Sequence, residues 1–374
     1  MKLPCYWEAK SDFISNHKTL RFPMVIICLI LLIAASLLMQ TLIFGGLLVF
    51  LKHIKYFLSV LPMILFMSVA GAEIVEPDVD KGFADPIPQG EFDELFIPLK
   101  RVQNLFLVEA RVDSTIGFFI LDTGAPHLVL NKTYFTEGRK AANGNTSYGI
   151  TGGGNTVLNT TVDSLIIQKL FYTQVDADIV NLGHIEDARG VKILGLLGAS
   201  LFLAMEMEID LRNNLLILYK LDSEGNRIAG NERKEEPNLF MPIDITNDVI
   251  FMDVTIATKK LRFCLDTGAE RNVLSNMVSN KILKQFTLTT SSALTGSGGS
   301  DQLVLNGRID SVEIGGSYFV AMPFILTNLN YLQLVYDTNI NGILGYDFLS
   351  KGIVTINHKK KKLSMYFYTP KSNE

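Results

Sequence analysis

The stretch FILDTGA at residues 119–125 recurs as FCLDTGA at residues 263–269. At the same offset of 144 positions, Phe96 aligns with Phe240 without a gap. Past a glycine cluster the offset becomes 147, and the match continues to the end of both copies. Two copies of about 130 residues are too few and too long for a solenoid, whose repeats span about 20 to 50 residues. The chain therefore contains a duplicated domain.

Each copy consists of short apolar stretches separated by polar or glycine-containing turns. Residues 105–112 and 117–121 are such stretches in the first copy, and residues 249–256 and 261–265 are their counterparts. Turns that recur every eight to twelve residues are typical of all-β proteins. We therefore predict an all-β body.

Changes in composition predict the domain boundaries. We expect a first lobe over residues 91–221 and a second lobe over residues 239–370, joined by a charged, glycine-containing linker at residues 222–238. Residues 73–90 form a proline-containing tether, and residues 1–72 form a hydrophobic targeting or transmembrane region.

Each lobe is predicted to end in a β-hairpin, over residues 205–219 and 353–368. Four consecutive lysines, Lys359 to Lys362, occupy the turn of the second hairpin. Because this is the turn position of the first hairpin as well, we interpret the lysine run as a solvated loop rather than a binding patch.

The N-terminal region contains two apolar runs. Residues 22–51 would rise roughly 45 Å as a helix, more than the roughly 30 Å that a bilayer core requires. The second run follows Lys52 and Lys55 and ends in small residues, which predicts a secretory signal cleaved after Ala72. The alternative is a second transmembrane helix, giving a membrane hairpin with a cytoplasm-facing body.

Positive charge flanks the first run on both sides, so the topology stays open. Translation starting at Met24 or Met39 would resolve the conflict, as would a first run that does not span. We expect the body outside the cytoplasm, either membrane-anchored or secreted or periplasmic.

Charge and cysteine content exclude two classes of protein. Residues 73–374 carry 28 basic against 36 acidic side chains, which argues against a nucleic-acid partner. Of three cysteines only Cys264 lies in the body, so an internal disulfide framework or a cysteine-ligated zinc fold is excluded there.

The two Asp-Thr-Gly triplets carry the candidate chemistry. Each follows an apolar strand, so packing about a pseudo-twofold axis would make Asp122 and Asp266 neighbours. Two carboxylates about 3 Å apart cannot both ionise readily, and they share one proton. Such a pair can activate water with one member and hydrogen-bond a substrate carbonyl with the other, without a metal or cofactor. Amide hydrolysis is the predicted reaction.

The other triplet residues are predicted to support this pair. The hydroxyls of Thr123 and Thr267 are suited to bond across the axis and hold both loops rigid. Gly124 and Gly268 permit a tight turn and a close approach of the backbone.

With these motifs, residues 91–370 resemble the retropepsin-like aspartic proteases, as two retroviral-protease-like units fused in one chain. The family pattern is a strand, Asp-Thr-Gly-Ala, a glycine-rich flap hairpin, and two apolar residues with Gly before a short helix. Both copies have every part, the last as residues 196–198 and 343–345. The resemblance implies two β-barrel lobes and a catalytic unit complete in one chain.

The resemblance also implies a peptide or protein substrate, bound in extended form beneath two flaps. Its flap or substrate-binding residues are glycines: Gly152, Gly153, Gly154, Gly296 and Gly298.

The chain departs from the family beside the triplets. Retroviral enzymes commonly have acidic residues just after the Ala and arginine after the apolar-apolar-Gly element. Here the positions after the Ala are occupied by Pro126-His127 in the first copy and Glu270-Arg271 in the second. The position after the apolar-apolar-Gly element is occupied by Ala199 in the first copy and Tyr346 in the second. The family's arginine-to-aspartate support is therefore not expected as such, and we interpret His127 as a bystander of the turn.

Ala125 and Ala269 lack a hydroxyl that could donate to the carboxylates and lower their pKa. We therefore predict a mildly acidic optimum, roughly pH 4 to 6.5.

Two other functions were weighed. A catalytically inactive, peptide-binding paired β-domain of the cell envelope is the main alternative to an aspartic endopeptidase. A serine or metal hydrolase has no support, because neither Gly-x-Ser-x-Gly nor His-Glu-x-x-His occurs.

Overall fold

The computed structural model describes residues 85–140, 146–148, 154–228, 233, 235–295, 301–336 and 338–369. Contacts divide the chain into Met1–Val79 and Asp80–Glu374, and all described residues belong to the second unit. The signal and transmembrane predictions for residues 1–72 lie outside the described residues, and a location outside the cytoplasm stays a prediction. No helix among the described residues is both long and apolar enough to span a bilayer.

The first lobe is an eight-stranded sheet in which β3 also pairs with β9, so that the sheet closes on itself like a barrel. Its strands β5 and β11 are wholly buried, and β10 alternates over much of its length, as expected for a sheet wrapped around a core. In spatial order they are β2 (Lys100–Val102), β3 (Leu105–Val112), β4 (Thr115–Leu121), β11 (Gly195–Leu197), β5 (Leu128–Asn131), β10 (Leu170–Val180), β9 (Leu158–Ile167) and β6 (Arg139–Lys140).

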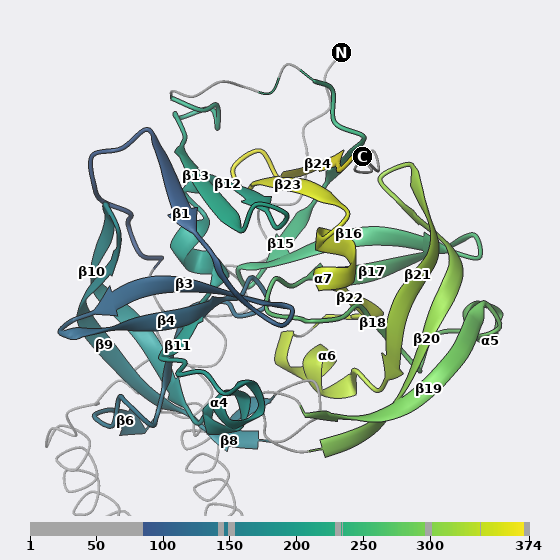
Figure 1. The fold of residues 1–374 in the computed structure, drawn as a ribbon, viewed down its shortest axis with the longest axis horizontal. Coiled ribbons are helices and arrows are strands. Elements are labelled where there is room, and N and C mark those ends of the chain that lie inside the picture. The colour runs from purple at the N-terminus through teal and green to yellow at the C-terminus, as the bar shows by residue number, and fades with distance from the viewer. Residues whose placement is uncertain are drawn as a thin grey trace, which may run out of the picture. The chain divides into compact units, whose positions relative to one another are not determined.

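The second lobe repeats this order strand for strand, with β16 pairing β20 in place of the β3–β9 closure. Its strands are β15 (Asp244–Thr246), β16 (Val249–Ile256), β17 (Lys259–Leu265), β22 (Gly342–Leu344), β18 (Val273–Ser275), β21 (Ser317–Thr327), β20 (Asp301–Ile314) and β19 (Phe286–Thr295). The predicted β-rich, duplicated fold is confirmed. In Figure 1 the first-lobe strands β3, β4, β9 and β10 lie on the left, and β17, β20 and β21 lie on the right.

A six-stranded sheet contains strands of both lobes. Its order is β1 (Glu94–Pro98), β13 (Leu215–Lys220), β12 (Met205–Asp210), β23 (Gly352–Asn357), β24 (Lys362–Phe367) and β14 (Leu239–Pro242). The lobes meet where β12 pairs with β23, with Glu208 opposite Thr355. One face carries apolar side chains such as Met207 and Ile356, which belong to a core cluster continuous with both lobes. The hairpins β12–β13 and β23–β24 agree with those that the sequence predicts.

In the described part of the chain, short helices interrupt the strands: α4 (Gly183–Arg189), η1 (Ala199–Phe202), α5 (Asn280–Leu283), α6 (Asn330–Tyr336) and α7 (Tyr346–Leu349). The sequence predicts η1 and α7 as the short helix after each apolar-apolar-Gly element. It does not predict α4 and α6. The N-cap residue of α4 is Leu182, whose side chain makes no capping bond, so the usual start signal is missing.

Candidate active site

Asp122 and Asp266 stand directly after β4 and β17, at equivalent points of the two lobes. The apolar-apolar-Gly elements form β11 and β22, which run parallel to these strands. The backbone N–H of Asp122 donates to the Leu197 carbonyl over 3.1 Å, and that of Asp266 donates to the Leu344 carbonyl over 3.0 Å. Two separate sequence motifs thus fix the backbone that carries each aspartate.

The two carboxyl groups are hydrogen-bonded to one another. Each also accepts two backbone N–H bonds on its Oδ1, from the two residues after its threonine. The donors are Gly124 (2.9 Å) and Ala125 (3.1 Å) for Asp122, and Gly268 (2.7 Å) and Ala269 (3.1 Å) for Asp266. The structure therefore brings the predicted acidic pair together and holds both side chains in position.

The triplet glycines make this approach possible. A Cβ added at Gly124 would lie 2.6 Å from Cγ of Asp266, and one at Gly268 would lie 2.6 Å from Cγ of Asp122. Both contacts are shorter than real Cβ atoms allow, and they involve the opposite lobe. A side chain at either position would displace the aspartate carboxyl of the opposite lobe.

The threonines bond across the two loops, and both are buried. The Thr123 hydroxyl donates to the Leu265 carbonyl over 2.9 Å and accepts the Thr267 N–H over 3.1 Å. The Thr267 hydroxyl reciprocates, donating to the Leu121 carbonyl over 2.8 Å and accepting the Thr123 N–H over 3.0 Å. These four bonds form one network, which ties the aspartate of each lobe to the strand of the other.

Burial raises the pKa of both aspartates above the usual value of 3.8. The charge of Asp266 and the hydrogen bond with it raise the pKa of Asp122 further, whereas the same bond lowers that of Asp266. Backbone N–H donors oppose the increase at both sites, because they stabilise the charged form. The two carboxyl groups therefore titrate as a coupled pair.

Sequence analysis missed Tyr336, the last residue of α6. Its hydroxyl donates to the Gly124 carbonyl over 2.6 Å, so the second lobe contacts the loop that carries Asp122. The ring meets Phe251 edge-on, with the centroids 6.2 Å apart. Burial raises the pKa of this phenol well above its usual value, and the phenol therefore stays a donor.

A second contact across the lobes involves α4. Arg189 bonds the Glu270 carboxylate, with Nε 2.9 Å from Oε1. At the offset of 147, Arg189 is the counterpart of Tyr336. The two helices therefore reach equivalent loops of the opposite lobe with different side chains, and the repeat alone could not reveal this because the residue types differ.

The second lobe has an ion pair beside the positions of the family's arginine-to-aspartate support, but with the two residue types exchanged. Arg271, two residues after Ala269, lies 3.0 Å from Oδ2 of Asp347, which follows the second apolar-apolar-Gly element. Asp347 also accepts the Asn272 N–H over 3.0 Å. In the first lobe, His127 Nε2 lies 2.8 Å from Oδ2 of Asp178, so this histidine is part of a side-chain pair.

The predicted flaps fall at the tips of two hairpins. In the first lobe β7 (Thr146–Tyr148) pairs with β8 (Gly154–Thr156), and Gly154 is opposite Tyr148. In the second lobe the last pairs of β19 and β20 are Leu294 with Gln302 and Thr295 with Asp301. The tip residues Gly152, Gly153, Gly296 and Gly298 lie outside the described residues, so their contact with substrate stays a prediction.

The described part of the chain contains no group of three or more His, Cys, Asp or Glu side chains arranged to hold a metal ion.

Comparison with known proteins gives one family match. Residues 252–348, which include Asp266, match the aspartyl protease family. Similar solved structures include an aspartic proteinase from Irpex lacteus, with a TM-score of 0.44 and 14% identity over 75% of this chain and all of the other. Basic 7S globulin from soybean gives a TM-score of 0.43 and 10% identity over 75% of this chain and 96% of the other. A search of curated proteins found no match.

The family match lies wholly within the predicted second lobe. It confirms the resemblance to the aspartic proteases that the sequence motifs predict.

Proposed function

We propose that this chain is an aspartic endopeptidase, with Asp122 and Asp266 as its catalytic residues. The observation that carries the proposal is the direct contact between two half-buried carboxyl groups supplied by equivalent loops of the two lobes. Such a pair holds an acid and a base at one point, as general acid–base hydrolysis requires.

The reaction needs only a water molecule and the one shared proton. The ionised carboxyl takes a proton from water as its oxygen attacks the peptide carbonyl carbon, while the protonated carboxyl donates its proton to the carbonyl oxygen. A neutral tetrahedral diol results. The first carboxyl then gives its proton to the leaving nitrogen, the C–N bond breaks, and a diol proton returns to the second carboxyl.

The surrounding contacts support this assignment. The threonine network and the backbone N–H donors fix both carboxyl groups before substrate binds, and preorganised groups need little rearrangement during reaction. The hairpins β7–β8 and β19–β20 are suited to cover an extended peptide and to pair with its backbone, which is how strands commonly recognise peptides.

Peptide cleavage by the full-length chain and three variants tests the proposal. A quenched fluorescent peptide library, followed by mass spectrometry of the products, measures kcat/KM between pH 3 and pH 8. Asp122→Asn and Asp266→Asn should each lower kcat/KM by at least about 1000-fold, because the one carboxyl that remains cannot act as the base and the acid at the same time. Asp253→Asn is the matched control, since that carboxylate is exposed and pairs only with Lys260 among the described residues.

The alternative, a paired β-domain that binds peptides without cleaving them, makes a different prediction. The wild-type chain would then bind library peptides and leave them intact at every pH. Equal cleavage by wild type and both active-site variants would also exclude the proposed pair, because the activity would have another source.

A further inference from the structure

The polar face of the six-stranded sheet borders a cavity. Residues 221–228 and 233, here called the crossing segment, follow β13 and contact this face: Leu221 and Arg227 form an isolated β-bridge, and Arg227 and Arg233 bond Glu208 of β12. A cavity of about 130 Å³ lies between the crossing segment and the sheet. Its lining includes Thr355, Ser364, Lys360, Lys362, Arg233 and Tyr366.

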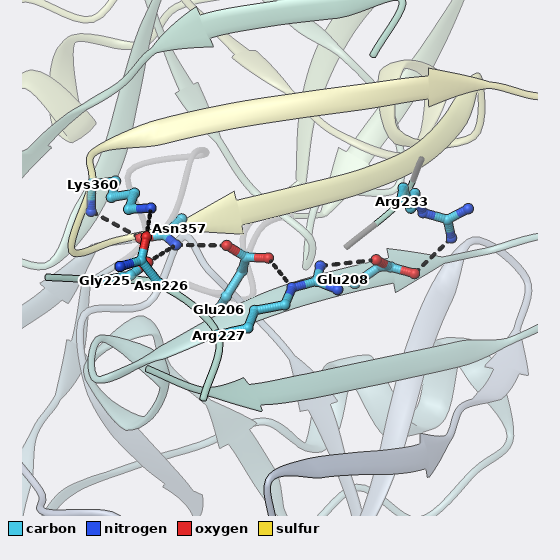
Figure 2. Close-up of polar contacts among 8 residues, drawn as sticks. All are labelled: Glu206, Glu208, Gly225, Asn226, Arg227, Arg233, Asn357 and Lys360. Carbon is cyan, nitrogen blue, oxygen red and sulfur yellow. Dashed lines mark hydrogen bonds and ion pairs between the residues drawn. The ribbon is translucent and has the colours of Figure 1, made fainter. Parts of the chain in front are cut away.

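The carboxylates at this cavity already have partners on every oxygen, as Figure 2 shows. Glu206 accepts from Arg227 on Oε1 and from Asn357 on Oε2, both over 2.6 Å. Glu208 accepts from Arg233 on Oε1 over 2.6 Å and from Arg227 on Oε2 over 3.2 Å. Both side chains are buried. The acceptors here are therefore largely used within the protein.

The amide of Asn357 is occupied as well. It donates to Glu206 and to the Gly225 carbonyl over 2.9 Å, and its oxygen accepts the Lys360 N–H over 2.8 Å. The Lys360 ammonium contacts the side-chain oxygen of Asn226. Figure 2 shows these groups at the end of the polar chain that begins at Arg233.

The groups that have no protein partner at this cavity are donors. The Thr355 hydroxyl is buried, with the residue only 8% exposed, and finds no hydrogen-bond partner among the described residues. Thr355 is directly opposite Ser364 in the sheet, and Asn357 is opposite Lys362, so these side chains share one face. In the described part of the chain, no hydrogen bond or ion pair engages the Ser364 hydroxyl or the Lys362 ammonium. Buried polar groups without a partner are rare, and each calls for a ligand or water.

The charge at the cavity is positive. Four cationic side chains line the cavity, against one lining carboxylate, Glu206, and a second, Glu208, that pairs with both arginines; the four are Arg227, Arg233, Lys360 and Lys362. The net charge of two positive units favours an anion. Donors arrive from two strands, the β23–β24 turn and the crossing segment, which suits an anion with three or four oxygens better than a carboxylate with two.

We propose that this cavity binds a small tetrahedral oxyanion of the phosphate class. Lys362, Thr355 and Ser364 contact the anion, while Arg233 and Lys360 flank it. The bound anion connects β24 of the second lobe with the segment that leaves the first. The proposal does not depend on peptidase activity, and it assigns to two lysines of the 359–362 run the binding role that the sequence pattern disfavours.

Calorimetry and thermal melting of the full-length chain with sodium phosphate test the proposal, against sodium chloride at equal ionic strength. Wild type should bind one phosphate and melt at a higher temperature in phosphate than in chloride, since a ligand of the folded state stabilises it. Lys362→Met should weaken binding at least tenfold, and Thr355→Val should weaken it severalfold.

Lys359→Met is the matched control. It removes the same charge from the same turn, but the Lys359 ammonium bonds the Asp222 carbonyl over 2.9 Å and does not line the cavity. Its phosphate affinity should stay within twofold of wild type. The proposal is overturned if wild type shows no difference between phosphate and chloride, or if Lys359→Met loses as much affinity as Lys362→Met. Thr355→Val keeps the test decisive if a lysine variant fails to fold.

Discussion

At neutral pH, the contact between the carboxyl groups of Asp122 and Asp266 lowers the stability of the folded chain. Burial raises both pKa values above the usual 3.8, so the folded chain holds a proton that the unfolded chain releases. The bound proton makes its full contribution to the free energy of unfolding when the pH is below the aspartate pKa of the unfolded chain. This contribution is lost as the pH rises through the higher pKa values of the folded chain. The pair therefore costs the most stability at neutral and alkaline pH.

Replacing one of these carboxyls with an amide should therefore stabilise the chain. In Asp122→Asn, the side-chain oxygen can still accept from Gly124 and Ala125, and the new amide can donate to Asp266. We expect the melting temperature to rise by at least about 2 °C at pH 7, and by less at pH 3.5, where the native pair is already protonated. Differential scanning calorimetry at both pH values measures this.

Asp253→Asn serves as the control, because that carboxylate is exposed. If the Asp122→Asn variant melts at or below the wild-type temperature at pH 7, the contact between the two carboxyl groups does not destabilise the folded chain.

At the scale of single residues, the sequence predicts the triplets well but not their neighbours. The sequence alone identifies the triplet Asp122, Thr123 and Gly124 as a candidate site, because the same triplet recurs at residues 266–268. Tyr336 and Arg189 occupy one repeat position with unlike residues, so comparison of the copies gives no signal. Their roles come from tertiary contacts.

Among the secondary-structure elements, α6 is bonded through one hydroxyl to the first-lobe loop that carries Asp122. The Tyr336 phenol is partly buried and donates to the Gly124 carbonyl over 2.6 Å. Tyr336→Phe keeps the ring contact with Phe251 and removes only this bond. We expect the free energy of unfolding to fall by about 1 kcal/mol, the usual net value of such a bond. Urea denaturation followed by fluorescence or circular dichroism measures it.

Tyr318→Phe is the matched control, because Tyr318 is 70% exposed and should change the free energy of unfolding by less than about 0.5 kcal/mol. If both variants unfold alike, the bond between α6 and Gly124 contributes nothing to stability.

Strands and hairpins were more predictable than helices, for a physical reason. Alternation and turn residues are local, and they predict β12–β13 and β23–β24 with boundaries close to those observed. The helices α4 and α6 span seven residues each, too few for a clear helical period. Such short helices depend on the packing around them rather than on local preference.

For the whole molecule, the duplication explains the architecture. Features that the repeat does not show, such as the cavity at the six-stranded sheet, come from residues that the two copies do not share. Equivalent strands give both lobes the same sheet order, and a sheet of strands from both copies joins them. The cavity beneath the crossing segment has no sequence motif, because its residues meet only through the register of β23 against β24. The lysine run illustrates this limit, since only two of its members line the cavity.

The central claim is that two carboxyls from two lobes share one proton and hydrolyse peptides together. The pH dependence of kcat/KM for a cleaved peptide tests it most directly, because each limb reports one ionisation of the free pair. We expect a bell-shaped profile with its maximum at roughly pH 4 to 6.5, and we expect this bell to disappear in Asp122→Asn. Activity that peaks near pH 2, or a profile that Asp122→Asn leaves unchanged, would contradict it.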